Sequence, residues 1–147
     1  MKNNTIAEVH VNYLPKKQKQ LKVSCSNDAE GFFRSIWSDQ ISYREEMYVA
    51  LLNRANMILG YNKLSVGGTS STVVDMKMLM QLLLKTNTHS FILCHNHPSG
   101  HLKASHQDKE LTKQVKAASK LLDIQLLDHL ILSADSYISM ADEGEIK

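Results

Sequence analysis

The sequence predicts an α/β (α+β) fold in which a mixed central sheet is flanked by helices. Three short apolar runs, at residues 47–52, 90–94 and 124–132, have the composition of strands that are buried in a sheet. They alternate along the chain with segments whose apolar residues recur at helical spacing, as in helices that pack on a sheet. The length of 147 residues fits one domain.

The N-terminal part is predicted to form short strands joined by a polar connection. Residues 7–13 and 21–25 alternate crudely between apolar and polar side chains, which favours two strands. The basic run at 16–19 between them is interpreted as a solvated loop rather than a binding site. We expect residues 1–27 to form an N-terminal extension that packs on the main domain.

A helix and a hairpin are predicted next. Residues 26–28 (Ser-Asn-Asp) have the chemistry of a helix N-cap, and the apolar residues that follow indicate a short amphipathic helix over 29–37. The apolar run at 47–52 is the first strand of the predicted hairpin. A polar turn at 53–56 then leads into its partner strand at 57–61.

Helices and strands alternate in the predicted second half. The Gly- and Ser-rich residues 67–71 form a loop, and the helical spacing of apolar residues over 73–85 indicates a helix. The strand at 90–94 precedes the clearest helix of the chain, at 105–122. A short strand at 137–140 follows the apolar run at 124–132.

Composition and charge exclude several classes of protein. The net charge of +2 is too small to indicate nucleic-acid binding by itself. No apolar run reaches the ~20 residues of a membrane span, and no signal-peptide pattern is present, so we expect a cytoplasmic protein that does not bind membranes. Cys25 and Cys94 are then expected to be reduced. Strand alternation points Cys94 away from His95 and His97, which predicts a buried core thiol.

Two histidines and an aspartate form the most informative pattern. His95 and His97 lie two apart at a strand end and therefore point to the same side. A turn at 98–100 reverses the chain, and Asp108 returns from the next element. Two imidazoles and one carboxylate make an open zinc site with one position left for water. Such a site is typical of hydrolysis rather than of structural zinc, which usually has four protein ligands. The sequence therefore predicts Zn²⁺ bound by His95, His97 and Asp108.

Ser105 and Asp108 also have a purely structural interpretation. The spacing Ser-x-x-Asp at the start of an amphipathic helix resembles a capping box, in which the aspartate is also favoured by the helix dipole. The two interpretations are compatible, because a helix N-terminus is a rigid place from which to present a carboxylate to a metal.

A hydrolytic zinc site also needs a general base, and two glutamates are candidates. Glu45 and Glu46 precede the strand at 47–52. If this strand neighbours the strand at 90–94, one of the two carboxylates faces the open coordination position. The alternative is that both are solvent-facing charges, and the pattern alone does not choose between Glu45 and Glu46.

The spacing His95-x-His97-x7-Ser105-x2-Asp108 with an upstream glutamate resembles the JAMM (MPN-type) zinc hydrolase motif. Several separated segments, present in order over about residues 28–147, more closely resemble the RadC family. These segments are Asn53-Arg54-Ala55-Asn56, Gly67-Gly68, the HNHPSG run at 95–100, Leu111-Thr112, the LDHLI run at 127–131 and the MADEG run at 140–144.

The resemblance implies a cytidine-deaminase-like JAMM domain over residues 28–147. It also implies roles for the site residues: His95, His97 and Asp108 as zinc ligands, Glu45 as general acid/base with Glu46 as the fallback, and Ser105 as a donor to the oxyanion. Longer RadC proteins carry a DNA-associated helix-hairpin-helix region. Residues 1–27 are too short for one, so the chain is expected to be a short form.

Four further residues near the motifs are expected to be structural. His101 and His106 are expected to be solvent-exposed loop residues rather than ligands. His129 is expected to be a packed, hydrogen-bonded histidine. Asp128 is costly to bury alone, so it requires a hydrogen-bonding partner such as His129 or a loop amide.

Three function classes follow from these observations. The first is a zinc-dependent metallopeptidase or isopeptidase, in which a zinc-activated water attacks an amide carbonyl of a peptide or protein substrate. The alternative is a DNA-repair or mobile-element accessory protein of the RadC type without its own catalysis, although no aromatic and basic stacking platform is visible. A phosphodiester hydrolase is a weaker third class, because the chain has no recognised phosphate loop. The substrate and the oligomeric state are not predicted.

Overall fold

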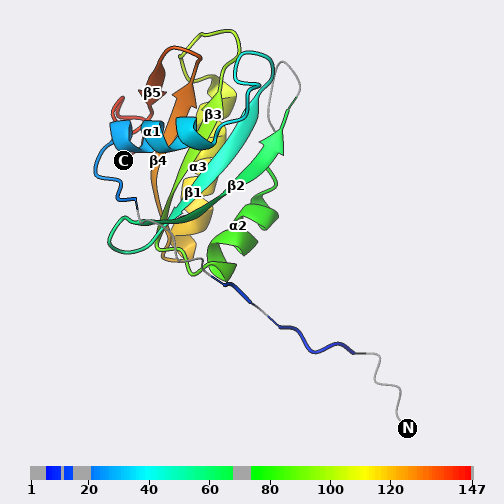
Figure 1. The fold of residues 1–147 in the computed structure, drawn as a ribbon. Coiled ribbons are helices and arrows are strands. Elements are labelled where there is room, and N and C mark those ends of the chain that lie inside the picture. The colour runs from blue at the N-terminus through cyan, green and yellow to red at the C-terminus, as the bar shows by residue number, and fades with distance from the viewer. Residues whose placement is uncertain (1–5, 11, 15–20, 68–73, 147) are drawn as a thin grey trace.

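The computed structural model describes residues 6–10, 12–14, 21–67 and 74–146 (Figure 1). Within these residues, helices and strands follow in an alternating order. They are α1 (Ser26–Ile36), β1 (Glu46–Leu52), β2 (Ile58–Val66), α2 (Met76–Lys85), β3 (Ser90–Asn96), α3 (His106–Leu121), β4 (Gln125–Leu132) and β5 (Tyr137–Ser139).

The strands form one mixed sheet in the order β2-β1-β3-β4-β5. β3 and β4 are parallel and are joined by the crossover helix α3, whereas every other neighbouring pair is antiparallel. A parallel pair needs such a crossover, and the helix covers one face of the sheet. The predicted α/β class, with a mixed central sheet and flanking helices, is confirmed.

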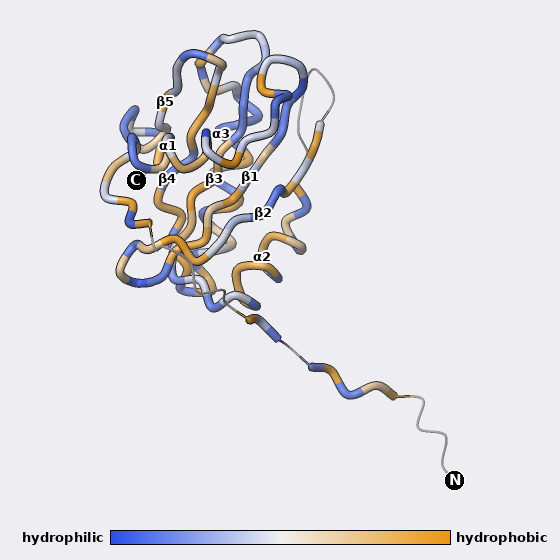
Figure 2. The backbone as a smooth tube through the Cα atoms, viewed as in Figure 1, coloured by the Kyte–Doolittle hydropathy of each residue, from blue (hydrophilic) through white to orange (hydrophobic). Residues whose placement is uncertain are grey.

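Helices cover both faces of the sheet: α1 lies on one face, and α2 and α3 lie on the other (Figure 1). Figure 2 shows hydrophobic stretches along β3 and β4 in the middle of the molecule. The buried side chains on the α1 face are Val23, Ala29, Phe33, Tyr48, Ala50, Leu52, Ile92, Cys94, Leu130 and Leu132. Those on the α2/α3 face are Met47, Val49, Leu51, Leu79, Leu83, Phe91, Leu93, Val115, Ile124 and Leu126.

Strand alternation decides on which face each side chain of β3 lies. Phe91 and Leu93 pack against the α2/α3 side, so His95 points to that side as well. Cys94 packs in the α1-side cluster and is fully buried, which confirms the predicted core thiol on the opposite face. Cys25 is exposed, and both cysteines are free.

The described residues before α1 do not form the two strands that were predicted there. Residues 6–10 and 12–14 are neither helix nor strand, and they lead away from the body of the molecule (Figure 1). Over 21–25 a single antiparallel bridge joins Lys22 to Met57. Local alternation was misleading here because a strand also needs a partner along its length. The basic run at 16–19 lies outside the described residues.

Three element boundaries differ from the prediction by three residues or more. The first helix begins at Ser26 rather than Ala29, because the N-cap is Cys25, which makes no side-chain cap bond. β2 continues to Val66, five residues beyond the predicted end, with exposed residues that carry no periodic signal. α2 begins after Asp75, whose carboxylate accepts from the Met78 N–H. Of the predicted loop at 67–71, only Gly67 is described.

Among the described residues, no helix is both long and apolar enough to cross a membrane.

Candidate metal centre

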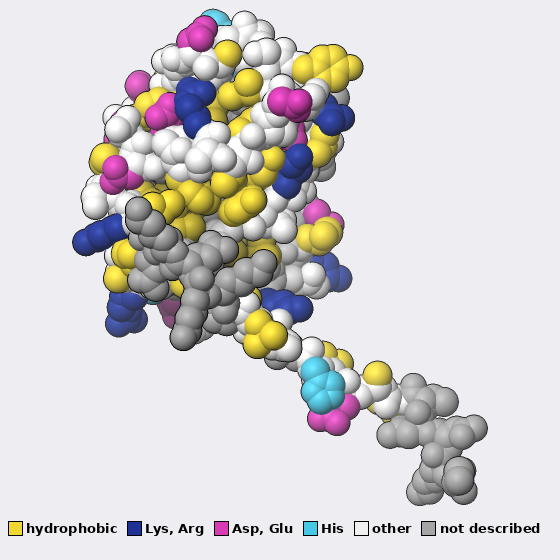
Figure 3. All heavy atoms as spheres, viewed as in Figure 1, with side chains coloured by type: hydrophobic (Ala, Val, Ile, Leu, Met, Phe, Trp, Pro, Cys, Tyr) yellow, Lys and Arg dark blue, Asp and Glu magenta, His cyan; other side chains and the backbone are white. Residues whose placement is uncertain are grey.

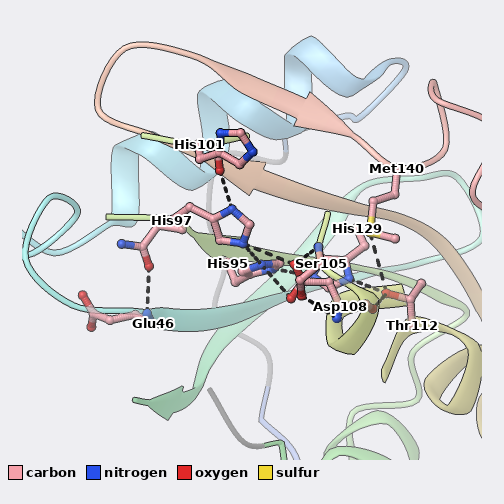
Figure 4. Close-up of polar contacts among 10 residues, drawn as sticks. Glu46, His95, His97, His101, Ser105, Asp108, Thr112, His129 and Met140 are labelled. Atoms are coloured by element: carbon pink, nitrogen blue, oxygen red, sulfur yellow. Dashed lines mark hydrogen bonds and ion pairs between the residues drawn. The ribbon is translucent and has the colours of Figure 1, made fainter. Parts of the chain in front are cut away.

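Three side chains converge at the C-terminal end of β3. His95 Nε2 lies 3.2 Å from one carboxylate oxygen of Asp108, and His97 Nε2 lies 3.2 Å from the other. The two Nε2 atoms are 3.0 Å apart. One ligand atom from each residue can be chosen so that all three lie within 4.8 Å of one another, as a metal site requires (Figure 4).

The fold brings these three residues together for simple reasons. His95 is the penultimate residue of β3, and His97 follows the strand, two residues further on the same side. The chain then turns at Gly100, which has a φ of +83° that favours glycine. Asp108 lies in the first turn of α3, the helix that packs on this side of the sheet.

Each histidine has its other ring nitrogen occupied, so both present Nε2 to the centre. His97 Nδ1 donates to the carbonyl oxygen of His101, 2.6 Å away. His95 Nδ1 lies 2.7 Å from Nε2 of the buried His129. Such outer contacts fix the tautomer and the ring orientation of metal-binding histidines.

The donor set fits zinc. At a Zn–N distance of ~2.0–2.1 Å, ligand atoms at the corners of a tetrahedron are about 3.3 Å apart. The observed separations of 3.0–3.2 Å are close to this value. Two lone pairs of neutral imidazoles and a carboxylate would repel one another at this distance, and a cation between them removes the repulsion.

The charges of the metal-free centre are strongly coupled. Burial opposes ionisation of Asp108, but its close contacts with His95 and His97 outweigh burial and hold the pKa of this carboxyl well below its usual range. The hydrogen bond to Asp108 in turn raises the pKa of His97, against the effect of burial. A proton on His97 therefore competes with a metal for the same nitrogen.

Ser105 and Asp108 form the predicted capping box at the start of α3. The Ser105 side chain accepts from the Asp108 N–H at 3.0 Å, and the Asp108 carboxylate accepts from the Ser105 N–H at 2.8 Å. The carboxylate that faces the histidines is thus fixed by the helix start, so the capping box is confirmed and is compatible with the metal-binding interpretation.

Glu45 and Glu46 lie on opposite faces of the sheet. The Glu45 carboxyl interacts electrostatically with His95, His97 and Asp108, and burial raises its pKa even though the two histidines oppose the shift. Glu46 is fully buried and pairs with Lys63 Nζ at 2.6 Å and with the Ser38 hydroxyl. Figure 4 shows the Glu46 side chain directed away from the ligands.

The peptide unit between Glu45 and Glu46 is held from both sides. The Glu45 carbonyl accepts from the Gly67 N–H at 2.8 Å, and the Glu46 N–H donates to the Asn96 side chain at 2.7 Å. The buried Asn96 amide also donates to the carbonyls of Ile41 and Arg44, at 2.7 and 2.9 Å. Asn96 therefore anchors the loop that carries Glu45 to the strand that carries His95.

The sequence did not reveal the role of Asn96. Alternation along β3 places it on the face opposite the two flanking histidines, but its partners lie about 50 positions earlier in the chain. No local pattern identifies contacts of that kind.

The four residues expected to be structural are placed as follows. His101 and His106 are exposed, although His106 is the first residue of α3 rather than a loop residue. His129 is buried and hydrogen-bonded, as predicted, and burial lowers its pKa well below the usual value. Asp128 accepts from the backbone N–H groups of His129 and Ala141 and from the Ser139 hydroxyl, so it has the partners it was expected to need.

The geometry agrees with comparisons to known proteins. The RadC-like JAB domain family matches residues 23–145 of the chain. This chain belongs to that family. The predicted RadC resemblance, with a JAB (MPN-type) domain, is therefore confirmed.

Curated relatives of this RadC-like JAB domain are UPF0758 proteins of bacteria. One from Flavobacterium johnsoniae is 40% identical over 126 residues, which cover 86% of this chain and 54% of the relative. Another from Porphyromonas gingivalis is 44% identical over 102 residues, covering 69% of this chain and 45% of the relative. A third from Clostridium acetobutylicum is 39% identical over 101 residues, with coverages of 69% and 44%. The matched part spans about half the length of these relatives.

Proposed function

We propose that this RadC-like JAB domain is a zinc-dependent hydrolase that cleaves an amide bond of a peptide or protein, as a metallopeptidase or an isopeptidase. The observation that carries the proposal is the convergence of His95, His97 and Asp108 on the face of the sheet to which Glu45 belongs. When bound there, zinc polarises the scissile carbonyl and lowers the pKa of water to about 7.

Glu45 is the general acid/base in this proposal. Its carboxylate takes a proton from the attacking water and delivers that proton to the leaving amine. A carboxyl whose pKa is raised by burial holds a proton more readily between these two steps than an exposed one does. Glu46 is unsuited to this role because Lys63 and Ser38 engage it on the other face.

Ser105 is the donor to the oxyanion in this proposal. Its hydroxyl oxygen accepts from the Asp108 N–H, so the capping bond does not use the hydroxyl proton. The proton is free to point toward the carbonyl oxygen of a substrate as that oxygen becomes negative. Because Ser105 is fixed at the start of α3, this donor is already oriented before the substrate arrives.

A peptide or protein substrate is favoured over DNA as the partner. On the face seen in Figure 3, Lys and Arg side chains are interspersed with acidic and hydrophobic ones and do not gather into a stripe. DNA binding relies on clustered cations and is strongest at low salt. A titration with duplex DNA at low salt tests this alternative, and tight, salt-dependent binding would favour it.

The test compares two neighbouring glutamates. Glu45→Gln is expected to retain zinc but to lower hydrolysis of a panel of peptide- and isopeptide-linked fluorogenic substrates by about 10²–10⁴-fold, since it removes the base. Glu46→Gln is the matched control and is expected to retain both zinc and turnover.

Zinc content of each purified protein is measured by elemental analysis beside the kinetic assay. Full turnover by Glu45→Gln removes Glu45 from the mechanism. If the wild-type protein takes up no zinc at neutral pH, the hydrolase proposal itself fails.

A further inference from the structure

We propose that Thr112 and His129 are positioning residues that place the ring proton of His95 on Nδ1, so that its Nε2 keeps the lone pair that binds zinc. The inference rests on the proposed zinc site and extends it by a chain of hydrogen bonds inside the domain. Neither Thr112 nor His129 is a ligand in the proposed site.

The side chains of Thr112, His129 and His95 form a continuous, buried series of hydrogen bonds on the α3 side of the sheet. His129 lies on β4, and its Cα is paired with that of Leu93 on the neighbouring strand, two residues before His95. His129 Nε2 is 2.7 Å from His95 Nδ1, and His129 Nδ1 is 2.7 Å from the Thr112 hydroxyl (Figure 4). The exposed fractions of His129 and Thr112 are 0% and 3%.

The backbone carbonyl of Asp108 decides which atom donates in each hydrogen bond of this series. The Thr112 hydroxyl lies 2.6 Å from this carbonyl oxygen, one helical turn earlier in α3. A carbonyl only accepts, so the proton between the two oxygens belongs to Thr112. The Met140 sulfur, 3.7 Å from the same hydroxyl, is a weaker and more distant acceptor.

With its proton committed, the Thr112 oxygen accepts, and His129 Nδ1 must donate to it. A buried imidazole whose partners carry no negative charge stays neutral, so it holds one proton only. His129 Nε2 is then an acceptor, and the proton between the two rings belongs to His95 Nδ1. His95 Nε2 is left with a lone pair that faces His97 and Asp108.

The contrast with His97 explains why two residues are needed. His97 Nδ1 meets the carbonyl of His101, which only accepts, so one contact fixes its tautomer. His95 Nδ1 meets an imidazole, which donates or accepts according to its own proton. Thr112 removes this ambiguity. Without its hydroxyl, His129 is free to donate to His95 Nδ1, which moves the His95 proton onto the metal-binding nitrogen.

Thr112→Val and Thr112→Ser form a matched pair for the test. Valine keeps the shape of threonine but loses the hydroxyl, whereas serine keeps the hydroxyl and loses a methyl group. Loss of such an outer contact costs about 10–100-fold in metal affinity. We expect Thr112→Val to weaken zinc binding by that factor and Thr112→Ser to restore affinity to within about threefold of the wild type.

Two measurements separate proton placement from general damage. Zinc affinity is determined by competition with a chromophoric chelator. The tautomers of His95 and His129 in the metal-free protein are determined by NMR of the ring nitrogens at mildly alkaline pH. The wild type and Thr112→Ser should show the proton of both rings on Nδ1, whereas Thr112→Val should show a population with the His95 proton on Nε2.

The inference is overturned if His95 of the metal-free wild type carries its proton on Nε2. It is also overturned if Thr112→Val binds zinc as tightly as Thr112→Ser. Neither measurement uses hydrolysis, so the outcomes are separable from those of the proposed function. Correct tautomers and tight zinc binding without turnover would refute the hydrolase proposal and leave this inference standing.

Discussion

Replacing Asn96 with alanine tests whether this side chain anchors the loop that carries Glu45. The substitution removes three hydrogen bonds: one from the Glu46 N–H and two to the carbonyls of Ile41 and Arg44. Asn96 is fully buried on the face opposite the metal ligands, so the change reaches the site only through the loop and the strand.

The loss of stability depends on the burial of the three backbone groups that lose their hydrogen bond to Asn96. Glu46 is fully buried, so its unpaired N–H costs about 1–3 kcal/mol. Ile41 is half-buried and Arg44 is exposed, so water replaces the amide at their carbonyls and each bond is worth about 0.5–1 kcal/mol. We expect a loss of about 2–5 kcal/mol in the free energy of unfolding. For a domain of this size, that is a fall in Tm of roughly 6–15 °C.

Urea unfolding of the metal-free protein measures the stability change, and kinetics measures its functional consequence. Displacement of Glu45 by about 1 Å is expected to lower turnover about 10²-fold while zinc affinity stays unchanged. Asn62→Ala, on the exposed part of β2, is the control for loss of an asparagine side chain. If Asn96→Ala is as stable as Asn62→Ala, or if it loses zinc, the proposed anchoring of the loop is wrong.

Three further predictions concern the metal centre and the core. His97→Ala and Asp108→Ala should abolish stoichiometric zinc binding in elemental analysis but leave the circular dichroism of the fold intact; unfolding of either variant would point to structural zinc instead. The raised pKa of His97 should give zinc affinity and metal-free stability opposite pH dependences. As pH falls from the raised pKa of His97 toward about 6.5, protonation stabilises the metal-free protein and weakens zinc binding. Parallel trends in chelator competition and urea unfolding would contradict this coupling. Phe33→Ala should cost about 3–5 kcal/mol in urea unfolding, because Phe33 is fully buried between α1 and the sheet; a loss below about 1 kcal/mol would show that α1 adds little to stability.

The sequence predicted the central elements well and the outer ones poorly. The apolar runs that became β1, β3 and β4 are buried on both faces, so their composition alone marks them as strands. Residues 58–66 form an edge strand with exposed positions, and the composition of its C-terminal half does not mark it as a strand. The predicted strand at 7–13 shows the converse error: its described residues alternate but are irregular, and among the described residues no neighbouring strand pairs with them.

For the candidate site, spacing along the chain was informative and contacts across the sheet were not. The pattern of His95, His97 and Asp108 was readable because one turn separates the strand from the helix. The choice between Glu45 and Glu46 required the register of β1 against β3, in which Met47 pairs with His95. His129 was correctly predicted to be buried and hydrogen-bonded, but its contact with His95 depends on the parallel pairing of β3 with β4.

The proposed zinc ligands and the proposed base come from separate parts of the chain. His95, His97 and Asp108 belong to one continuous stretch from β3 into α3, whereas Glu45 lies in the loop that immediately precedes β1. A substitution of Glu45 therefore leaves the stretch that carries the three proposed ligands unchanged. In a relative that keeps the two histidines and the aspartate but lacks the glutamate, we expect the proposed metal site to persist without its proposed base.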